Sequence, residues 1–252
     1  MLPTVALQDI VAYLGELLQV ERYREEEPSN GLLVDVRQPV MRIAAAVSTS
    51  FTAIRGASAA GAQLLLVHHT TWSHIDLHLR AEKEEALRDA GVSLYGAHAA
   101  LDCAPEFGNP DSLARLVGVR VEGRFLEWAG GQPGVYGRAD GSFAGFAERV
   151  RVALGVPTQS WQNNESFGRV AIVTGAGSGT TMLDGARSLG CDTYLTGEGT
   201  MDTKLFAREI GMNLIFGTHY ATEAPGIRSL AERVAAHFHL PWHLIDEEPD
   251  IL

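Results

Sequence analysis

The chain has 252 residues, of which 46% are hydrophobic and 20% charged, and its formal net charge is −11. This length and composition exclude a wholly disordered chain and indicate one large or two small globular domains with a substantial core. The acidic balance argues against nucleic acid or an anionic membrane as the main partner.

The cysteine content and the first residues indicate a protein of the reducing cytoplasm. The two cysteines, Cys103 and Cys191, cannot form a disulfide framework, and neither belongs to a CxxC pair. No basic segment precedes an apolar run at the start of the chain, so no signal peptide is expected. No stretch approaches about 18 uninterrupted apolar residues, so no membrane span is expected either.

The first half of the chain alternates helical and strand patterns. Apolar residues spaced for one helix face from Leu7 to Leu18 predict an opening helix, and the charged run at 21–27 predicts a solvated connection. Leu64–Val67 is entirely apolar, which is typical of a strand buried on both faces of a parallel sheet. The other elements expected here are strands at 32–36, 43–47 and 93–95 and helices at 52–60, 82–89 and 111–116.

The second half repeats this alternation after a glycine-rich segment at 123–145, which predicts a crossing between two lobes and a hairpin. The pattern indicates an α/β fold with two lobes of related architecture, at residues 1–123 and 124–252. The expected elements are helices at 143–154, 181–188, 201–209 and 226–238 and strands at 169–174, 193–196 and 213–216.

Two adjacent histidines, His68 and His69, follow the buried strand at 64–67 directly. The end of a strand in an open α/β sheet is a common ligand site. Neighbouring side chains of an extended chain point to opposite sides, so the pair is expected to reach one metal only if the chain turns, although it could serve two neighbouring metals. Two histidines that merely cap a strand or helix are the alternative.

Two further strand ends supply the same residue types. His98 and Asp102 follow the strand at 93–95, and His219 and Glu223 follow the strand at 213–216. Pro225 disfavours a helical residue before it, so Glu223 is expected in a loop or at a helix start rather than at helical spacing from His219. Imidazole and carboxylate groups without a thiolate suit Zn²⁺, Mn²⁺, Fe²⁺ or Ni²⁺, and carboxylates can bridge two ions. The three strand ends together predict a metal site.

Several blocks of the sequence resemble the NIF3-like dinuclear metal family, whose members are also called GTP cyclohydrolase I type 2 homologues. In the first half, the similar blocks are Gly61-Ala-Gln-Leu-Leu-Leu-Val-His-His-Thr, Tyr95-Gly-Ala-His-Ala-Ala-Leu-Asp-Cys and Gly108-Asn-Pro-Asp-Ser-Leu-Ala-Arg-Leu-Val-Gly. In the second half, they are Val170-Ala-Ile-Val-Thr-Gly-Ala-Gly-Ser-Gly, Tyr194-Leu-Thr-Gly-Glu and Thr218-His-Tyr-Ala-Thr-Glu. The blocks follow the family order over nearly the whole chain, with Thr218 where the family has glycine.

The resemblance implies two interlinked α/β lobes with a dinuclear metal site in the cleft between them, and toroidal homohexamers. The family's five ligands fall on His68, His69, Asp102, His219 and Glu223, with the two carboxylates as candidate bridges between ions of Zn, Fe, Mn or Ni. His98 would lie in the same pocket as a proton shuttle, substrate contact or accessory ligand. The implied function is hydrolysis of a small-molecule substrate, such as a nucleotide, by metal-activated water. A metal-binding regulatory or scaffolding protein without turnover is the alternative.

Three other features of the sequence bear on the site. Glu198 is a candidate catalytic base, and a surface role is the alternative for it. The turn from Gly175 to Gly179 could hold an anion at a helix N-terminus, but it lacks the lysine of a P-loop, and a tight strand-to-helix turn is the simpler interpretation. Asp76 lies where the resemblance fails, and it is expected in a loop with no effect on the metals.

Overall fold

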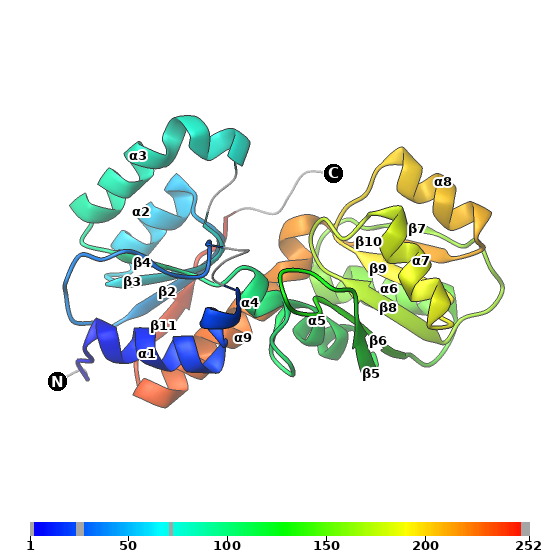
Figure 1. The fold of residues 1–252 in the computed structure, drawn as a ribbon, viewed down its shortest axis with the longest axis horizontal. Helices are drawn as coiled ribbons and strands as arrows, with labels where there is room; N and C mark the ends of the chain where they lie inside the picture. Colours follow the sequence, from blue (N-terminus) through cyan, green and yellow to red (C-terminus); the bar gives the residue numbers. More distant parts are fainter. Residues whose placement is uncertain (1–2, 24–27, 71–72, 248–252) are drawn as a thin grey trace. The chain divides into compact units, whose positions relative to one another are not determined.

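The computed structural model describes residues 3–23, 28–70 and 73–247, so the connection expected at 21–27 lies mostly outside the described residues. The chain forms two compact units (Figure 1). Unit 1 comprises Met1–Ala104 and Ile227–Glu248, and unit 2 comprises Pro105–Gly226. Both units combine helices with a sheet, which confirms the α/β class. The predicted boundary between two lobes at residues 123 and 124 stays a prediction, because a compact unit need not fold independently of the rest of the chain.

Unit 1 is built on a five-stranded sheet in the order β1-β4-β3-β2-β11. All neighbouring strands are parallel except β1, which pairs antiparallel with β4 at one edge. Because the parallel strands run in the same direction, their carboxyl ends meet at one edge of the sheet. The strands are β1 at Gly31–Val34, β2 at Ile43–Ser48, β3 at Leu64–His69, β4 at Ser93–Gly96 and β11 at Trp242–Leu244.

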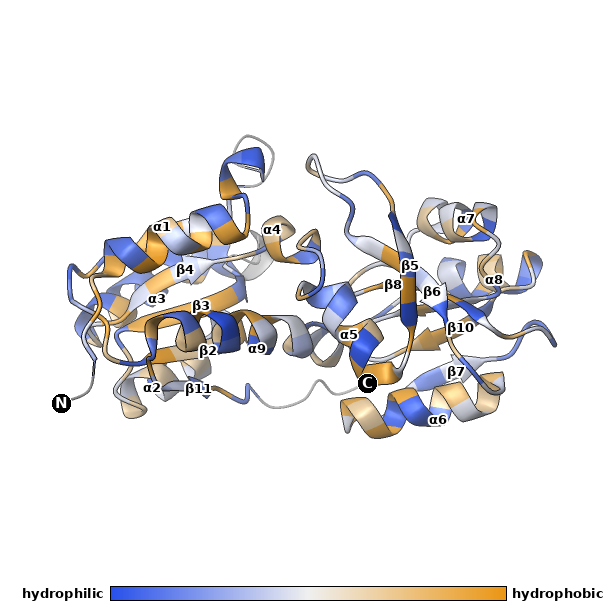
Figure 2. Ribbon diagram, turned by 90° about the horizontal axis from the view of Figure 1, so that it is seen from below, coloured by the Kyte–Doolittle hydropathy of each residue, from blue (hydrophilic) through white to orange (hydrophobic). Residues whose placement is uncertain are grey.

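Helices cover both faces of the sheet of unit 1. Helices α2 (Phe51–Ala59) and α3 (Ser73–Asp89) lie on one face, and α1 (Leu7–Leu17) and the later turns of α9 (His219–Phe238) lie on the other (Figure 1). Every residue of β3 is buried, as the apolar run at 64–67 predicts. Figure 2 shows this contrast in colour, since β2 and β3 are mainly hydrophobic whereas the surrounding helices alternate hydrophobic and hydrophilic bands.

Unit 2 is built on a six-stranded sheet in the order β5-β6-β8-β9-β10-β7. Strands β8, β9 and β10 are parallel, and the remaining pairs are antiparallel. The antiparallel pair β5 and β6 confirms the hairpin expected in the glycine-rich segment. The strands are β5 at Arg120–Phe125, β6 at Gly134–Arg138, β7 at Gln159–Trp161, β8 at Arg169–Val173, β9 at Thr193–Thr196 and β10 at Asn213–Phe216.

Two apolar clusters fill the two faces of the sheet of unit 2. One cluster joins α5 (Asn109–Val117) and α6 (Phe143–Leu154) to strand residues such as Ile172. The other joins α7 (Thr180–Ser188) and α8 (Met201–Glu209) to residues such as Leu214. The central parallel strands are therefore covered on both faces, and ligands of such sheets commonly bind at the carboxyl ends of the strands.

Helix α9 corrects the expectation for the segment around Pro225. The helix begins at His219, not at 226, and Pro225 lies inside it. A proline removes one backbone hydrogen bond, but the first turn has other supports. The Thr218 hydroxyl accepts from the backbone N–H of Ala221 at 3.2 Å, and the Thr222 N–H donates to the Thr218 carbonyl at 3.2 Å. His219 and Glu223 are consequently at helical i,i+4 spacing, contrary to the sequence-based expectation.

Helix α3 corrects the expectation for Asp76. The helix begins at Ser73, nine residues before the predicted start, so Asp76 lies in its first turn rather than in a loop. The Asp76 carboxylate accepts a 2.5 Å hydrogen bond from the Lys83 ammonium, and both side chains are more than nine-tenths buried. The predicted helix started too late because the first part of this segment has no apolar periodicity, and its buried carboxylate is stabilised by an ion pair instead.

Four short elements carried no sequence signal of their own: β7, β11, the 3₁₀ turn η1 (Val20–Tyr23) and helix α4 (Ala99–Asp102). Each is three or four residues long, which is below the length at which a period can be recognised. None of the helices in the described ranges is long and apolar enough to cross a membrane.

Candidate metal centre

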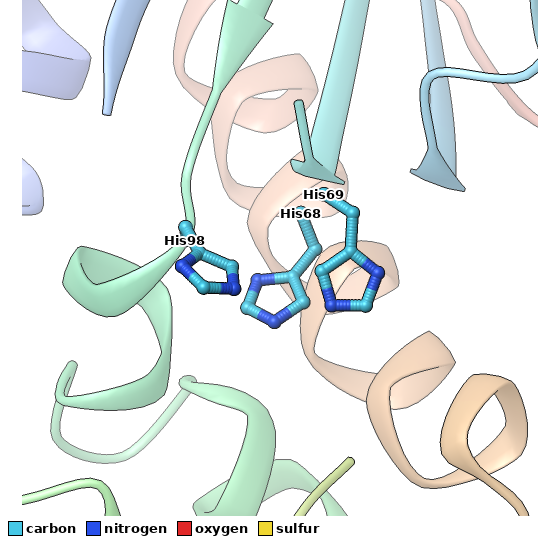
Figure 3. A group of neighbouring side chains, drawn as sticks. All are labelled: His68, His69 and His98. Atoms are coloured by element: carbon cyan, nitrogen blue, oxygen red, sulfur yellow. The ribbon is translucent and has the colours of Figure 1, made fainter. Parts of the chain in front are cut away.

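The histidine pair ends strand β3, and both side chains are buried. Their imidazole rings lie side by side with centroids 4.6 Å apart, rather than on opposite sides of the strand. The ring of His98 lies 4.8 Å from that of His68 and 5.4 Å from that of His69 (Figure 3). Each of the three offers one ring nitrogen within 4.8 Å of the others, a spacing that could hold a metal ion.

The backbone fixes which nitrogen of His68 is available. Its Nδ1 lies 2.8 Å from the Ala97 carbonyl oxygen. A carbonyl only accepts, so Nδ1 carries the hydrogen and Nε2 keeps its lone pair for a ligand bond. The same Nε2 lies 3.6 Å from Oδ1 of Asp102. His68 and Asp102 therefore present a nitrogen and an oxygen to the same point.

The neighbouring strand end holds His69. Both the N–H and the hydroxyl of Thr49 donate to the His69 carbonyl, at 2.9 and 3.2 Å. The hydroxyl of Ser48, the last residue of β2, lies 3.4 Å from Nδ1 of His69. Sequence reasoning missed Ser48, although its place at the adjacent parallel strand end is the same signal that singled out the histidines.

Asp102 and His98 are brought to the pair by helix α4, which follows β4. His98 is the residue immediately before this single turn, and Asp102 is its last residue, so the two lie one turn apart. The Asp102 N–H donates to the His98 carbonyl at 3.1 Å. A four-residue helix thus turns the end of β4 so that both of the residues expected there reach the histidine pair within unit 1.

In unit 2, the site residues gather around His219. Its Nε2 lies 3.2 Å from Oε1 of Glu223, and its Nδ1 lies 3.1 Å from Oε1 of Glu198. Glu223 is buried, whereas the Glu198 side chain is 56% exposed. Glu198 contacts the imidazole of His219 while remaining exposed, and its role as a catalytic base stays a prediction.

The surroundings of His219 favour its protonated form. Burial lowers the pKa of His219, but the hydrogen bonds and charges of Glu223 and Glu198 outweigh this effect and raise the pKa to about 9. The carboxylates of Glu223 and Glu198 therefore stabilise a positive charge on the His219 ring. A divalent ion bound at Nε2 would supply positive charge at the same place.

Thr218, the residue before His219, has φ +67°. This left-handed conformation favours glycine, which the family resemblance implies here, and is unusual for a β-branched residue. Threonine is tolerated here because its hydroxyl caps the start of α9. The unusual backbone places His219 at the first position of the helix.

The profile of the family described as Duf34/NIF3 (NGG1p interacting factor 3) matches residues 5–250 of the chain. The chain belongs to this family. It is 33% identical over 249 residues to a GTP cyclohydrolase 1 type 2 homolog of Deinococcus radiodurans, covering 96% of this chain and 93% of the relative. It is 34% identical over 234 residues to a protein of the same name from Halobacterium salinarum, with 89% and 91% covered.

Two solved structures share the fold over nearly the full length of the chain. The protein ybgI, described as of unknown function, matches with a TM-score of 0.87 and 28% identity, over 98% of this chain and 99% of that one. The protein TTHA1606 from Thermus thermophilus matches with a TM-score of 0.81 and 27% identity, over 98% and 100%. The family resemblance inferred from the sequence blocks is thereby confirmed.

Proposed function

We propose that the chain is a metal-dependent hydrolase that holds two divalent ions per subunit through His68, His69, Asp102, His219 and Glu223. The observation that carries the proposal is the fixed tautomer of His68, whose Nε2 is left available beside the Asp102 carboxylate. A buried imidazole held in this way by a backbone carbonyl is a recurrent arrangement of metal ligands. His219, held through Nδ1 by Glu198, repeats the arrangement in unit 2.

The chemistry of the donor set fits divalent transition metals. All five residues offer imidazole nitrogen or carboxylate oxygen, which suits Zn²⁺, Fe²⁺, Mn²⁺ or Ni²⁺. The Asp102 and Glu223 side chains are buried, and a buried carboxylate needs a positive partner in its surroundings. Bound cations would add positive charge beside both carboxylates, which are the candidate bridges.

Divalent ions bound by these residues would lower the pKa of a water molecule and would polarise the bond to be cleaved. His98 and Glu198 are the candidates for proton transfer in the reaction. His98 lies beside the His68 ring and is the candidate to accept a proton and return it to the leaving group. Glu198 would orient His219 through Nδ1, and its exposed carboxylate is the second candidate base.

The proposed substrate is a small molecule, and GTP is the first compound to test because the relatives are named as GTP cyclohydrolase 1 type 2 homologs. The experiment is to load the protein with each of the four metals and screen nucleotides and generic phosphoesters for hydrolysis. Turnover that disappears in His98→Ala or Asp102→Ala would support the hydrolase. Metal binding without turnover of any compound would contradict it.

The second candidate is a metal-binding regulatory or scaffolding protein without turnover. The family description itself names an interacting factor, which favours this candidate. Turnover requires an open coordination position and a pocket, whereas a scaffold requires neither. The same screen separates the two functions, because a scaffold would bind metal and a protein partner without converting a substrate.

We also propose that the chain forms a homohexamer. Six copies would carry a formal charge of about −66, so the assembly would require internal pairing or screening of charge. Light scattering at moderate salt is expected to give the mass of six chains. A monomer under these conditions would contradict the proposal.

A further inference from the structure

The glycine-rich turn between β8 and α7 begins at Gly175, and this residue lies against the donor atoms of unit 2. A Cβ atom built on Gly175 would overlap Oε1 of Glu223 and would lie 2.9 Å from Nε2 of His219. The backbone at Gly175 also has φ +62°, which side chains rarely adopt. Two independent features therefore require glycine at this position.

The peptide groups of Gly175 bind the two segments that carry the donors. Its N–H donates to the Thr222 hydroxyl at 3.1 Å, next to Glu223 in helix α9. Its carbonyl accepts from the N–H groups of Gly197 and Glu198 at 3.0 and 3.1 Å, after strand β9. One residue thus holds the start of α9 and the segment of Glu198 at the same time.

The rest of the turn is anchored as well. The buried Tyr194 hydroxyl donates to the Gly177 carbonyl at 2.7 Å, and the Thr203 hydroxyl donates to the Ser178 carbonyl at 2.9 Å. Gly197 packs so closely that a Cβ there would lie 2.6 Å from the Gly175 carbonyl oxygen. Fixed contacts on both sides leave Gly175 little room to move away from the Glu223 carboxylate.

We propose that Gly175 is a positioning residue, whose bare backbone holds the Glu223 carboxylate and the His219 imidazole in place for a metal. This inference rests on the proposed metal-dependent function and assigns a role to the glycine-rich turn. In this proposal the turn from Gly175 to Gly179 positions His219 and Glu223 and does not bind an anion. A methyl group at Gly175 would displace Oε1 of Glu223, and with it the donor geometry.

The test compares Gly175→Ala with Gly155→Ala. Gly155 has φ +70° and nothing within 4 Å of its would-be Cβ, so it carries the same backbone penalty without the contact. Gly155→Ala is expected to bind Zn²⁺ as the unchanged protein does. Gly175→Ala is expected to bind it about 10- to 100-fold more weakly, as when the support of a metal ligand is lost. Equal affinity in the two variants would overturn the proposal.

A readout without metal separates this inference from the proposed function. The ¹⁵N and ¹H resonances of the His219 imidazole are expected to shift in metal-free Gly175→Ala and to stay unchanged in metal-free Gly155→Ala. If the unchanged protein binds no metal, the proposed function fails, while the imidazole resonances still decide the role of Gly175. Unshifted resonances in Gly175→Ala would overturn that role.

Combining Gly175→Ala with Glu223→Asp keeps the proposal testable if Gly175→Ala alone does not fold. Glu223→Asp withdraws the oxygen that the methyl group would meet, so Gly175→Ala should lower the melting temperature less in the Glu223→Asp background than in the unchanged chain. If Gly175→Ala alone does not fold, the double variant is expected to fold. Equal losses of melting temperature in both backgrounds, or no recovery of folding, would overturn the proposal.

Inorganic phosphate tests whether the turn binds an anion instead. If phosphate raises the melting temperature of the unchanged protein but not that of Gly175→Ala, the turn is an anion site and the proposal is overturned.

Discussion

Nδ1 of His219 lies 3.1 Å from Oε1 of Glu198, which leaves Nε2 of the same ring facing Glu223. An imidazole whose two nitrogens meet two carboxylates has a fixed orientation, and only one nitrogen is placed to exchange its proton for a metal. The exposed Glu198 therefore acts on the site through His219.

Replacing Glu198 tests this orienting contact. Glu198→Ala is expected to weaken metal binding about 10- to 100-fold, because the imidazole loses the partner that fixes its orientation. Glu198→Gln keeps an oxygen that can accept from Nδ1 and should bind metal nearly as the unchanged protein does. Isothermal titration calorimetry measures both. Equal affinities in the two variants would show that Glu198 does not orient the ring.

The stability of the metal-free protein should fall as the pH rises through the pKa of His219. Its folded-state pKa of about 9 lies above the ordinary value of 6.5, so the stabilising contribution is fully present below pH 6.5 and is lost as the pH passes 9. The loss is on the order of 3 kcal/mol. Urea unfolding at pH 6 and pH 9.5 measures it, and His219→Gln should remove this part of the pH dependence. An unchanged pH dependence in His219→Gln would contradict the assignment.

Metal removal should destabilise the fold. A metal that binds the folded chain and not the unfolded one stabilises it by linkage, so complete chelation is expected to lower the melting temperature by several degrees. Differential scanning calorimetry before and after chelation measures the change, and restoring the metal should reverse it. An unchanged melting temperature after verified metal removal would contradict a ligand set that includes both His219 and Glu223.

Asp102→Ala should remove at least one metal per chain. Two doubly charged ions about 3.5 Å apart would repel each other by about 19 kcal/mol at an effective dielectric constant of about 20, so the proposed pair of ions would be poorly compensated without the Asp102 carboxylate. Elemental analysis gives the stoichiometry. Asp89→Ala is the matched control, because Asp89 is exposed at the end of α3 in the same unit. Two metals retained in Asp102→Ala would show that the ligand set is wrong.

The buried ion pair between Asp76 and Lys83 leads to a separate prediction about the free energy of unfolding. Lys83→Met leaves the Asp76 carboxylate buried without its cation and is expected to cost about 3–5 kcal/mol of unfolding free energy. The double variant Asp76→Asn/Lys83→Met removes both charges and should recover most of that loss. Denaturant unfolding of the unchanged chain, of Asp76→Asn, of Lys83→Met and of the double variant measures the coupling. Additive losses would show that the two side chains do not depend on each other.

The sequence alone determined the α/β class, most of the longer elements and the candidate ligands. Hydrophobic period is a local property, so strands such as β3 and β10 and helices such as α6 and α8 were predicted close to their observed bounds. The ends of parallel strands meet at one edge of a sheet, so the residues at the ends of β3 and β4 could be grouped before any coordinates were known. His68, His98 and Asp102 do lie together.

Only the tertiary structure decided the features that depend on contacts between residues distant in the chain. The Ala97 carbonyl accepts from Nδ1 of His68, the Thr218 cap starts α9 ahead of Pro225, and Gly175 lies against Glu223. None of these contacts has a period or a propensity that a sequence could display. The physical reason is that each depends on where two backbones approach one another, and that is set by the packing of the whole sheet.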